Sequence, residues 1–174
     1  MQNLQYAADR LQQVHHRIAR AEHDSGRELG TVRLIGASKK QNVELLNAFC
    51  ANGLTDLGEN YVQEALDKKE ALKERSVIWH FIGAIQSNKT AQIAHNFNWV
   101  HSVDRLKIAR RLANQFEPNE NLPKLNILLQ INLDNEDSKA GVTEQNVLPT
   151  VESIQSLSNI DWRGVMLNPA PRDS

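Results

Sequence analysis

A lysine that follows a short apolar run is the residue of this sequence best suited to covalent chemistry. Residues 32–37 show no helical period and lie between Gly30 and polar residues, which is typical of a parallel strand covered on both faces. Alternation along that strand puts Arg33, Ile35, Ala37 and Lys39 on one face, with Lys39 at the carboxyl end, where α/β folds keep their chemistry. A desolvated lysine loses proton affinity, and its neutral amine attacks aldehydes. The alternative is a lysine that simply extends into solvent.

Other reactive side chains are weaker candidates. Glu59 ends one predicted strand and Asp104 follows another, and the two could pair as an acid and a base, although capping or supporting roles are the alternative. Lys139 lies in an acidic polar loop, where a solvated charge run is the default interpretation. Cys50 falls inside a predicted helix, so a Cys-His nucleophile pair has no support.

The sequence predicts neither a metal site nor a glycine-rich phosphate loop. His15, His16 and His23 lie on or beside the first predicted helix, but carboxylate or cysteine partners at ligand spacing are missing. We interpret these histidines as solvated surface residues. The sequence also contains no glycine-rich phosphate loop of either standard spacing.

The elements that must position these residues alternate along the chain. Caps are expected at Asn42, Ser87 and Asp104, and Thr143 is the candidate cap of the last helix, with Pro149 either kinking that helix or marking its first turn. The predicted strands cover residues 32–37, 55–59, 77–82, 99–103, 125–132 and 161–167. The predicted helices cover residues 2–24, 42–51, 60–72, 87–97 and 104–116, with a further helix near Thr143.

This alternation indicates one α/β domain, residues 1–174, with a parallel sheet and right-handed crossovers. A closed (β/α)₈ barrel has eight strands and typically more than about 200 residues. The sequence predicts a leading helix and six strands. Two architectures therefore remain from the pattern alone: an open doubly wound sheet, or a TIM-barrel-type fold without its carboxyl end.

Composition argues against several classes of protein, among them nucleic-acid-binding, disulfide-bonded and membrane-spanning proteins. The 174 residues are 40% hydrophobic and 24% charged, the net charge is −1 and the pI is about 6.6, so no basic surface for nucleic acid is indicated. A single cysteine excludes an internal disulfide and fits a reducing, cytoplasmic setting. No apolar run approaches the ~18 residues of a membrane span, and we expect neither a signal peptide nor a membrane partner.

Several short motifs follow one another in an order that is specific as a set. They are Ala37-Ser38-Lys39, Gly58-Glu59-Asn60-Tyr61-Val62-Gln63-Glu64, Trp79-His80-Phe81-Ile82-Gly83, Gln86-Ser87-Asn88-Lys89, Ser102-Val103-Asp104-Arg105, Gln130-Ile131-Asn132 with Ser138-Lys139-Ala140-Gly141, and Arg163-Gly164-Val165-Met166. Over nearly the whole chain the sequence resembles the YggS/PROSC family of pyridoxal 5′-phosphate (PLP) homeostasis proteins.

The resemblance implies a fold, a cofactor and a set of site residues. It implies a single-domain barrel like the amino-terminal domain of alanine racemase, with PLP held as a Schiff base on Lys39. Asn60, His80 and Met166 match positions that line the family's cofactor pocket. The family is regarded as binding and buffering PLP without established turnover, and PLP-dependent apo-enzymes are the partners expected to accept the cofactor.

The sequence departs from the family pattern at a few positions. Lys40 stands where threonine is usual, so two lysines are adjacent, and strand alternation is expected to turn only one of them inward. Asn168 and the pair Ala84-Ile85 replace other usual residues. The family also continues with Gly-Met-Ser and Gly-Ser-Thr…Arg-Ile-Gly segments that hold the cofactor phosphate. Because neither is present, we interpret the sequence as a carboxyl-truncated member.

Two alternatives remain beside PLP homeostasis. A PLP-dependent amino-acid racemase needs a second base on the opposite face of the cofactor, and Tyr61 is the least implausible candidate for that base. The other alternative is a barrel fragment without function.

Overall fold

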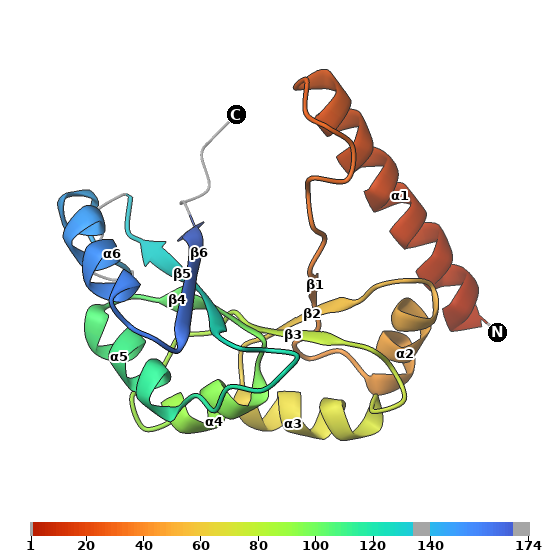
Figure 1. Cartoon of the computed structure of the whole chain (residues 1–174). Helices are drawn as coiled ribbons and strands as arrows, with labels where there is room; N and C mark the ends of the chain where they lie inside the picture. The colour runs from red at the N-terminus through yellow and green to blue at the C-terminus, as the bar shows by residue number, and fades with distance from the viewer. Residues whose placement is uncertain (1, 134–139, 169–174) are drawn as a thin grey trace. The chain divides into compact units, whose positions relative to one another are not determined.

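The structure is a computed structural model that describes residues 2–133 and 140–168 (Figure 1). After a leading helix, strands and helices alternate as the sequence predicts. The elements are α1 (Gln2–Asp24), β1 (Gly36–Ala37), α2 (Val43–Ala51), β2 (Asp56–Glu59), α3 (Val62–Ala71), β3 (Ile78–Phe81), α4 (Thr90–Asn96), β4 (Trp99–Val103), α5 (Leu106–Gln115), β5 (Leu125–Ile131), the 3₁₀ turn η1 (Glu144–Asn146), α6 (Val147–Gln155) and β6 (Ile160–Leu167).

The six strands in the described residues form one parallel sheet in the order β1-β2-β3-β4-β5-β6. Gly36 pairs with Leu57, His80 with Trp99, and Val100 with Ile127. Each strand therefore lies beside its neighbour in sequence, which is the order that a run of right-handed βα units produces. The predicted α/β class and the six predicted strands are confirmed.

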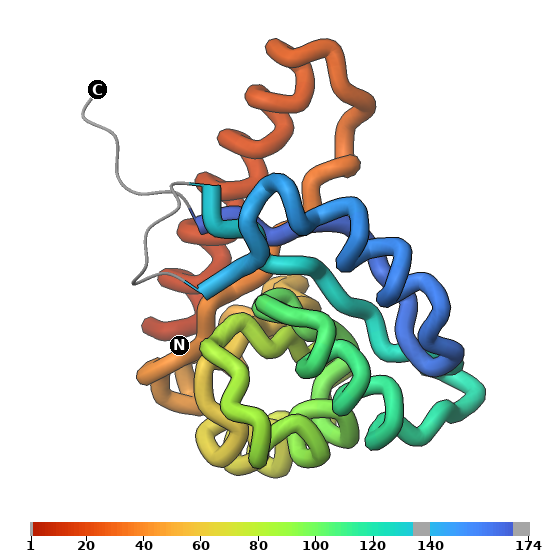
Figure 2. The backbone as a smooth tube through the Cα atoms, turned by 90° about the vertical axis from the view of Figure 1, so that its left-hand side faces the viewer, coloured from red at the N-terminus to blue at the C-terminus, as the bar shows by residue number. Residues whose placement is uncertain are grey.

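The chain divides into two compact units. Unit 1 comprises Met1–Gly58 and Glu64–Ile78, and unit 2 comprises Glu59–Gln63 and Trp79–Ser174. In unit 1, α1 packs against α2: the Tyr6 and Phe49 rings meet edge to face at 6.4 Å, and Asn52 Nδ2 donates to the carbonyl of Leu4 at 3.2 Å. Figure 2 shows α1 as one long red helix, after which the orange chain turns back towards β1.

That return segment explains why β1 is shorter than predicted. The buried Glu22 carboxylate accepts the backbone N–H groups of Gly30 and Val32, at 3.0 and 2.7 Å, and these bonds lower the pKa of Glu22. Val32 thus donates to a side chain instead of a sheet ladder, and the residue is 41% exposed. The predicted buried strand over residues 32–37 is wrong in extent, because only Gly36 and Ala37 form it.

Unit 2 has a conventional apolar core. Alternate residues of β5, which are Leu125, Ile127 and Leu129, are completely buried. The buried faces of α5 and α6 contribute side chains such as Leu112 and Ile154, and α4 lies beside α5 below the strands in Figure 1. This core fixes the strands from which the candidate site residues of the unit project.

The helix starts were predicted with mixed success. Asn42 caps α2 as expected, because its side chain accepts the Leu45 N–H at 2.8 Å, and Gly53 follows the helix with a φ of 98°. Ser87 does not cap α4, which begins at Thr90 with Lys89 in the N-cap position.

Asp104 was also wrong as a cap, since α5 has Arg105 at its N-cap and no side-chain capping bond. Thr143 precedes η1 without a capping bond, and Pro149 lies in the first turn of α6, where its missing N–H costs nothing. Within the described ranges, no helix has the length and apolar character that crossing a membrane requires.

Candidate functional site

Lys39 lies in a turn that directly follows β1, in unit 1. The ladder ends when Ser38 N–H donates to Gly58 O at 2.9 Å, and Gln41 N–H then donates to Ser38 O at 3.0 Å. Lys40 is the third residue of this four-residue turn and has a φ of 60°, the type II pattern. Lys39 is exposed while Ser38 is fully buried. The expected strand position of Lys39 is therefore wrong by two residues, although its place after the carboxyl end of β1 is confirmed.

Two residues of α3 hold the same turn, and neither was singled out from the sequence. Lys68, only 4% exposed, donates to Ser38 O at 2.6 Å and to Glu64 Oε1 at 2.7 Å. The same Glu64 oxygen accepts the Lys40 N–H at 2.5 Å. The four-residue spacing of Glu64 and Lys68 was visible, but that spacing is common on solvated helix faces and does not signal burial.

Asn60 lies between β2 and α3, in unit 2, where the backbone of the next strand end presses against it. Ile82 N–H donates to Glu59 O at 2.9 Å, and a Cβ on Gly83 would stand 2.3 Å from Asn60 O. The Ser102 hydroxyl donates to Gly83 O. The motifs that contain Glu59-Asn60, Ile82-Gly83 and Ser102 are therefore in direct contact with one another. Asn60 Oδ1 is buried and has no hydrogen-bond partner among the described residues.

His80 is the centre of an aromatic cluster in unit 2. It is 1% exposed, its Nδ1 lies 2.9 Å from His101 Nε2, and its ring stacks on Trp99 at 5.8 Å. Burial, with a smaller effect from His80, lowers the pKa of His101 from 6.5 to about 4. His101 is therefore uncharged at neutral pH, and one ring N–H is shared between the two imidazoles. Arg163 lies 5.9 Å from the centre of the Trp99 ring.

Met166 lies near the carboxyl end of β6, also in unit 2. It pairs with Gln130 of β5 and is partly buried. A register shift between Ile127 and Leu128 precedes this pair, and Gly164, with a φ of 144°, faces Leu128 at the shift. The irregularity changes which β6 residues share a face, so strand alternation counted from the sequence does not fix the direction of Met166.

The remaining sequence candidates do not assemble into a site. Glu59 is fully buried, and Asp104 is paired with the neighbouring Arg105. Cys50 lies inside α2, where burial raises the pKa of its thiol. Lys139 lies outside the described residues. Among residues 2–133 and 140–168, no group of three or more histidine, cysteine, aspartate or glutamate side chains could hold a metal ion.

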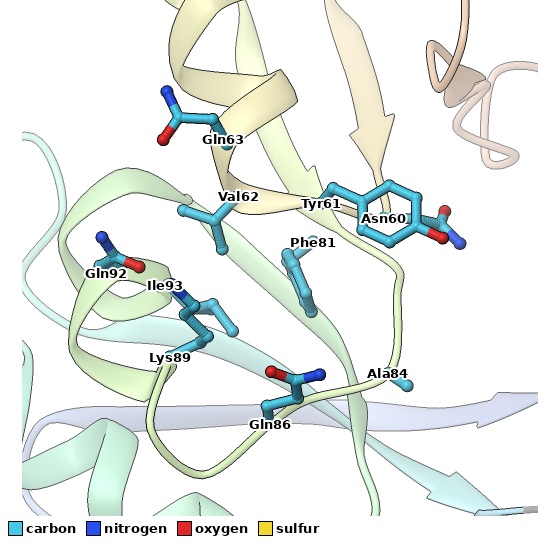
Figure 3. Close-up of a pocket in the computed structure, with 10 residues that line it drawn as sticks. All are labelled: Asn60, Tyr61, Val62, Gln63, Phe81, Ala84, Gln86, Lys89, Gln92 and Ile93. Carbon is cyan, nitrogen blue, oxygen red and sulfur yellow. The ribbon is translucent and has the colours of Figure 1, made fainter.

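A pocket of about 430 Å³ opens beside Asn60 in unit 2. Its floor is apolar, formed by Val62, Phe81 and Ile93, and polar side chains such as Gln86 and Lys89 line its rim (Figure 3). The sequence motifs at residues 60–63 and 86–89 therefore meet at one surface of the unit.

The sequence matches a known protein family and a relative of named function. A family profile described as "Alanine racemase, N-terminal domain" matches residues 10–174. The pyridoxal phosphate homeostasis protein of Pseudomonas aeruginosa is 44% identical over 164 residues, which cover 94% of this chain and 70% of the relative.

Solved structures agree with the sequence matches. PipY of Synechococcus elongatus, determined with PLP bound, has a TM-score of 0.76 at 27% identity and covers 94% of this chain and 70% of its own. Alanine racemase from Corynebacterium glutamicum has a TM-score of 0.60 at 15% identity and covers 94% of this chain and 44% of its own, a likeness in fold. The strand order together with this likeness confirms a barrel-type α/β fold of which six strands are described.

Proposed function

The chain belongs to the alanine racemase N-terminal domain family, whose profile covers residues 10–174, and from this premise we propose that it binds PLP and serves in PLP homeostasis. The observation that carries the proposal is the 44% identity, over 94% of the chain, to a protein named for PLP homeostasis. The similarity to PLP-bound PipY supports the same cofactor.

The residues present fit such a group. In unit 1, an exposed lysine follows a parallel strand in a turn whose backbone is hydrogen-bonded on both sides of it, which suits an amine that must meet an aldehyde. In unit 2, the buried Asn60 Oδ1 has no partner among the described residues and is available to a ligand donor. When bound, PLP supplies an aldehyde for an amine and an electron-withdrawing ring.

We assign the roles as follows. Lys39 binds the aldehyde of the cofactor covalently. Asn60 contributes a buried polar contact, and His80, held by His101 and Trp99, contributes its imidazole ring. Met166 contributes a polarisable apolar contact. These roles rest on the family resemblance together with the position of each residue after or near the end of its strand.

The first prediction concerns the covalent residue. Lys39→Ala is expected to abolish the long-wavelength absorption that develops when PLP is added, because the ε-amine that binds the aldehyde is gone. In the unchanged chain, borohydride reduction followed by fragment-ion mass spectrometry is expected to place the label on Lys39. The matched control is Lys40→Ala, which should leave both signals in place. A label found mainly on Lys40 would contradict the assignment, and no absorption change with the unchanged chain would support a fragment without function.

The second prediction is that the chain does not racemise amino acids. Inversion at an α-carbon requires a base on each face of the cofactor, and our proposal supplies an amine for one face. Tyr61 is one of the residues that line the pocket (Figure 3) and is 62% exposed, so it lacks the enclosure that positions a base. We expect L-alanine to keep its optical rotation during long incubation with protein and PLP. Sustained loss that depends on both would favour the racemase alternative.

Delivery of PLP to apo-enzymes is the role that homeostasis would require. We propose such apo-enzymes as partners, and a cytoplasmic location remains a prediction from the sequence. To test delivery, a PLP-free aminotransferase is incubated with the PLP-loaded protein while a scavenger rapidly removes free PLP. Recovery of aminotransferase activity under these conditions indicates delivery. No recovery beyond the scavenged control would contradict it.

A further inference from the structure

The turn that carries Lys39 is held by charged side chains more than by its own sequence. Its third residue, Lys40, adopts a left-handed φ of 60°, which residues with a Cβ disfavour. Glycine or asparagine is usual there. Besides its own bond from Gln41 N–H to Ser38 O, the turn is held by bonds from outside it.

Glu64 and Lys68, which we call the Glu64–Lys68 clamp, provide those bonds. Glu64 Oε1 accepts the Lys40 N–H at 2.5 Å, and Lys68 Nζ donates to Ser38 O at 2.6 Å. The peptide groups before and after Lys39 are thus both held, through residues 24 and 30 positions away in sequence. The two side chains also pair with each other at 2.7 Å.

The charges of the clamp support each other. The hydrogen bond from Lys68, more than the backbone bond from Lys40, keeps the pKa of Glu64 below its usual value, so the carboxylate is charged at neutral pH. The Lys68 side chain is 6% exposed, and a buried ammonium of this kind is tolerated only when paired and hydrogen-bonded. An ordinary surface pair would not need such enclosure.

We propose that Glu64 and Lys68 are positioning residues that fix the direction of the Lys39 side chain and so determine that Lys39, rather than Lys40, reacts with the cofactor aldehyde. The inference rests on the proposed function for its aldehyde, but the geometry that carries it belongs to unit 1 alone. Two lysine side chains have the same intrinsic reactivity, so backbone conformation and surroundings separate Lys39 from Lys40. A turn free to reorganise would present either amine.

The test measures the ratio of modification at Lys39 to that at Lys40 in two ways. In the first, PLP is added and reduced with borohydride. In the second, the unloaded protein is treated briefly with acetic anhydride, which needs no cofactor site. Fragment-ion mass spectrometry separates the adjacent residues in both cases.

Glu64→Ala, Glu64→Gln and Lys68→Met are the test variants. Glu64→Gln keeps an acceptor oxygen but loses the charge, and Lys68→Met keeps most of the apolar stem. The matched control is Glu70→Gln, because Glu70, in the last turn of α3, pairs with Lys73 at 2.8 Å but both side chains are exposed. Circular dichroism during heating identifies the variants that remain folded.

We expect Glu64→Ala and Lys68→Met to lower the Lys39-to-Lys40 ratio of the PLP label about tenfold or more, as loss of a charge-assisted hydrogen bond implies, and to lower the acetylation ratio in the same direction by less, because both lysines are exposed. Glu64→Gln should lower both ratios less, and Glu70→Gln should leave them unchanged. If Lys68→Met does not fold, the two Glu64 variants carry the test. An unchanged ratio in folded Glu64→Ala would overturn the inference. A change confined to the acetylation ratio, without PLP labelling in the unchanged chain, would support the clamp while refuting PLP binding.

Discussion

At the scale of single residues, neighbours decide what each candidate can do. Lys39 and Lys40 are chemically identical, yet Lys40 takes a left-handed φ and its N–H binds Glu64. His80 and His101 are likewise identical, yet burial and the proximity of His80 hold the pKa of His101 at about 4. In both pairs the residue type is the same, and only the surroundings distinguish the two copies.

The buried histidine pair predicts a pH effect on stability. An unfolded His101 binds a proton near pH 6.5, whereas the folded one does so near pH 4, so between these values the unfolded state holds more protons and stability falls as pH decreases. His101→Gln stays neutral and is expected to flatten this part of the stability curve. Urea unfolding at intervals from pH 7 to pH 4 measures it. His16→Gln, at an exposed position on α1, is the control, and equal slopes in all three proteins would contradict the prediction.

At the scale of elements, strand ends are fixed by backbone contacts between neighbouring loops. Gly83 follows β3 and leaves no space for a side chain against the backbone of Asn60. The Ser102 hydroxyl, on β4, donates a hydrogen bond to the carbonyl oxygen of the same glycine. The position of Asn60 is therefore a property of three consecutive strand ends in unit 2.

This contact predicts a large cost for one methyl group. Gly83→Ala would place Cβ 2.3 Å from Asn60 O and 2.7 Å from Asn60 Cα, both backbone atoms that cannot rotate away. We expect a loss of about 3 kcal/mol or more in the free energy of unfolding, the range of severe overpacking. Gly36→Ala is the control, because its close neighbour is the flexible end of Leu54 at 2.7 Å. Equal urea midpoints for the two variants would show that the Asn60 backbone yields.

At the scale of the whole molecule, the chain spans about 70% of the length of the P. aeruginosa relative and of PipY. The family resemblance puts the phosphate ligands of the cofactor in segments that this sequence does not contain. Residues 1–174 are thus expected to offer the amine and part of the ring pocket. The barrel-type fold agrees with this division, because cofactor phosphates in such barrels usually bind after the seventh and eighth strands.

The corresponding prediction is weak selectivity for the phosphate. Each hydrogen bond to a charged group contributes roughly 1.5–3 kcal/mol, so two or three missing bonds remove about 10² to 10⁶ in affinity. We expect the 174-residue chain to bind PLP and unphosphorylated pyridoxal with dissociation constants that differ by less than about tenfold. Spectral titration with both aldehydes measures this, and Lys39→Ala gives the background. A strong preference for PLP would place a phosphate site within these residues.

The sequence by itself determined the local features of this protein. The extent of α1, the Asn42 cap and the position of β5 depend on neighbours a few positions away, and all three were predicted correctly to within one residue. The order of motifs was also sufficient to identify the family. These features are local because helix periodicity, capping and strand alternation act over a few residues.

Only the tertiary structure decided how the candidate lysine is held. Residue 32 leaves the sheet because Glu22 captures its N–H, and the turn at Lys39 is fixed by Glu64 and Lys68. The close approach of Gly83 to Asn60 likewise joins residues far apart in sequence. Hydrogen bonds of charged groups and backbone contacts over 10 to 30 positions overrode the local pattern, because a buried charge must find its partner wherever the fold places one.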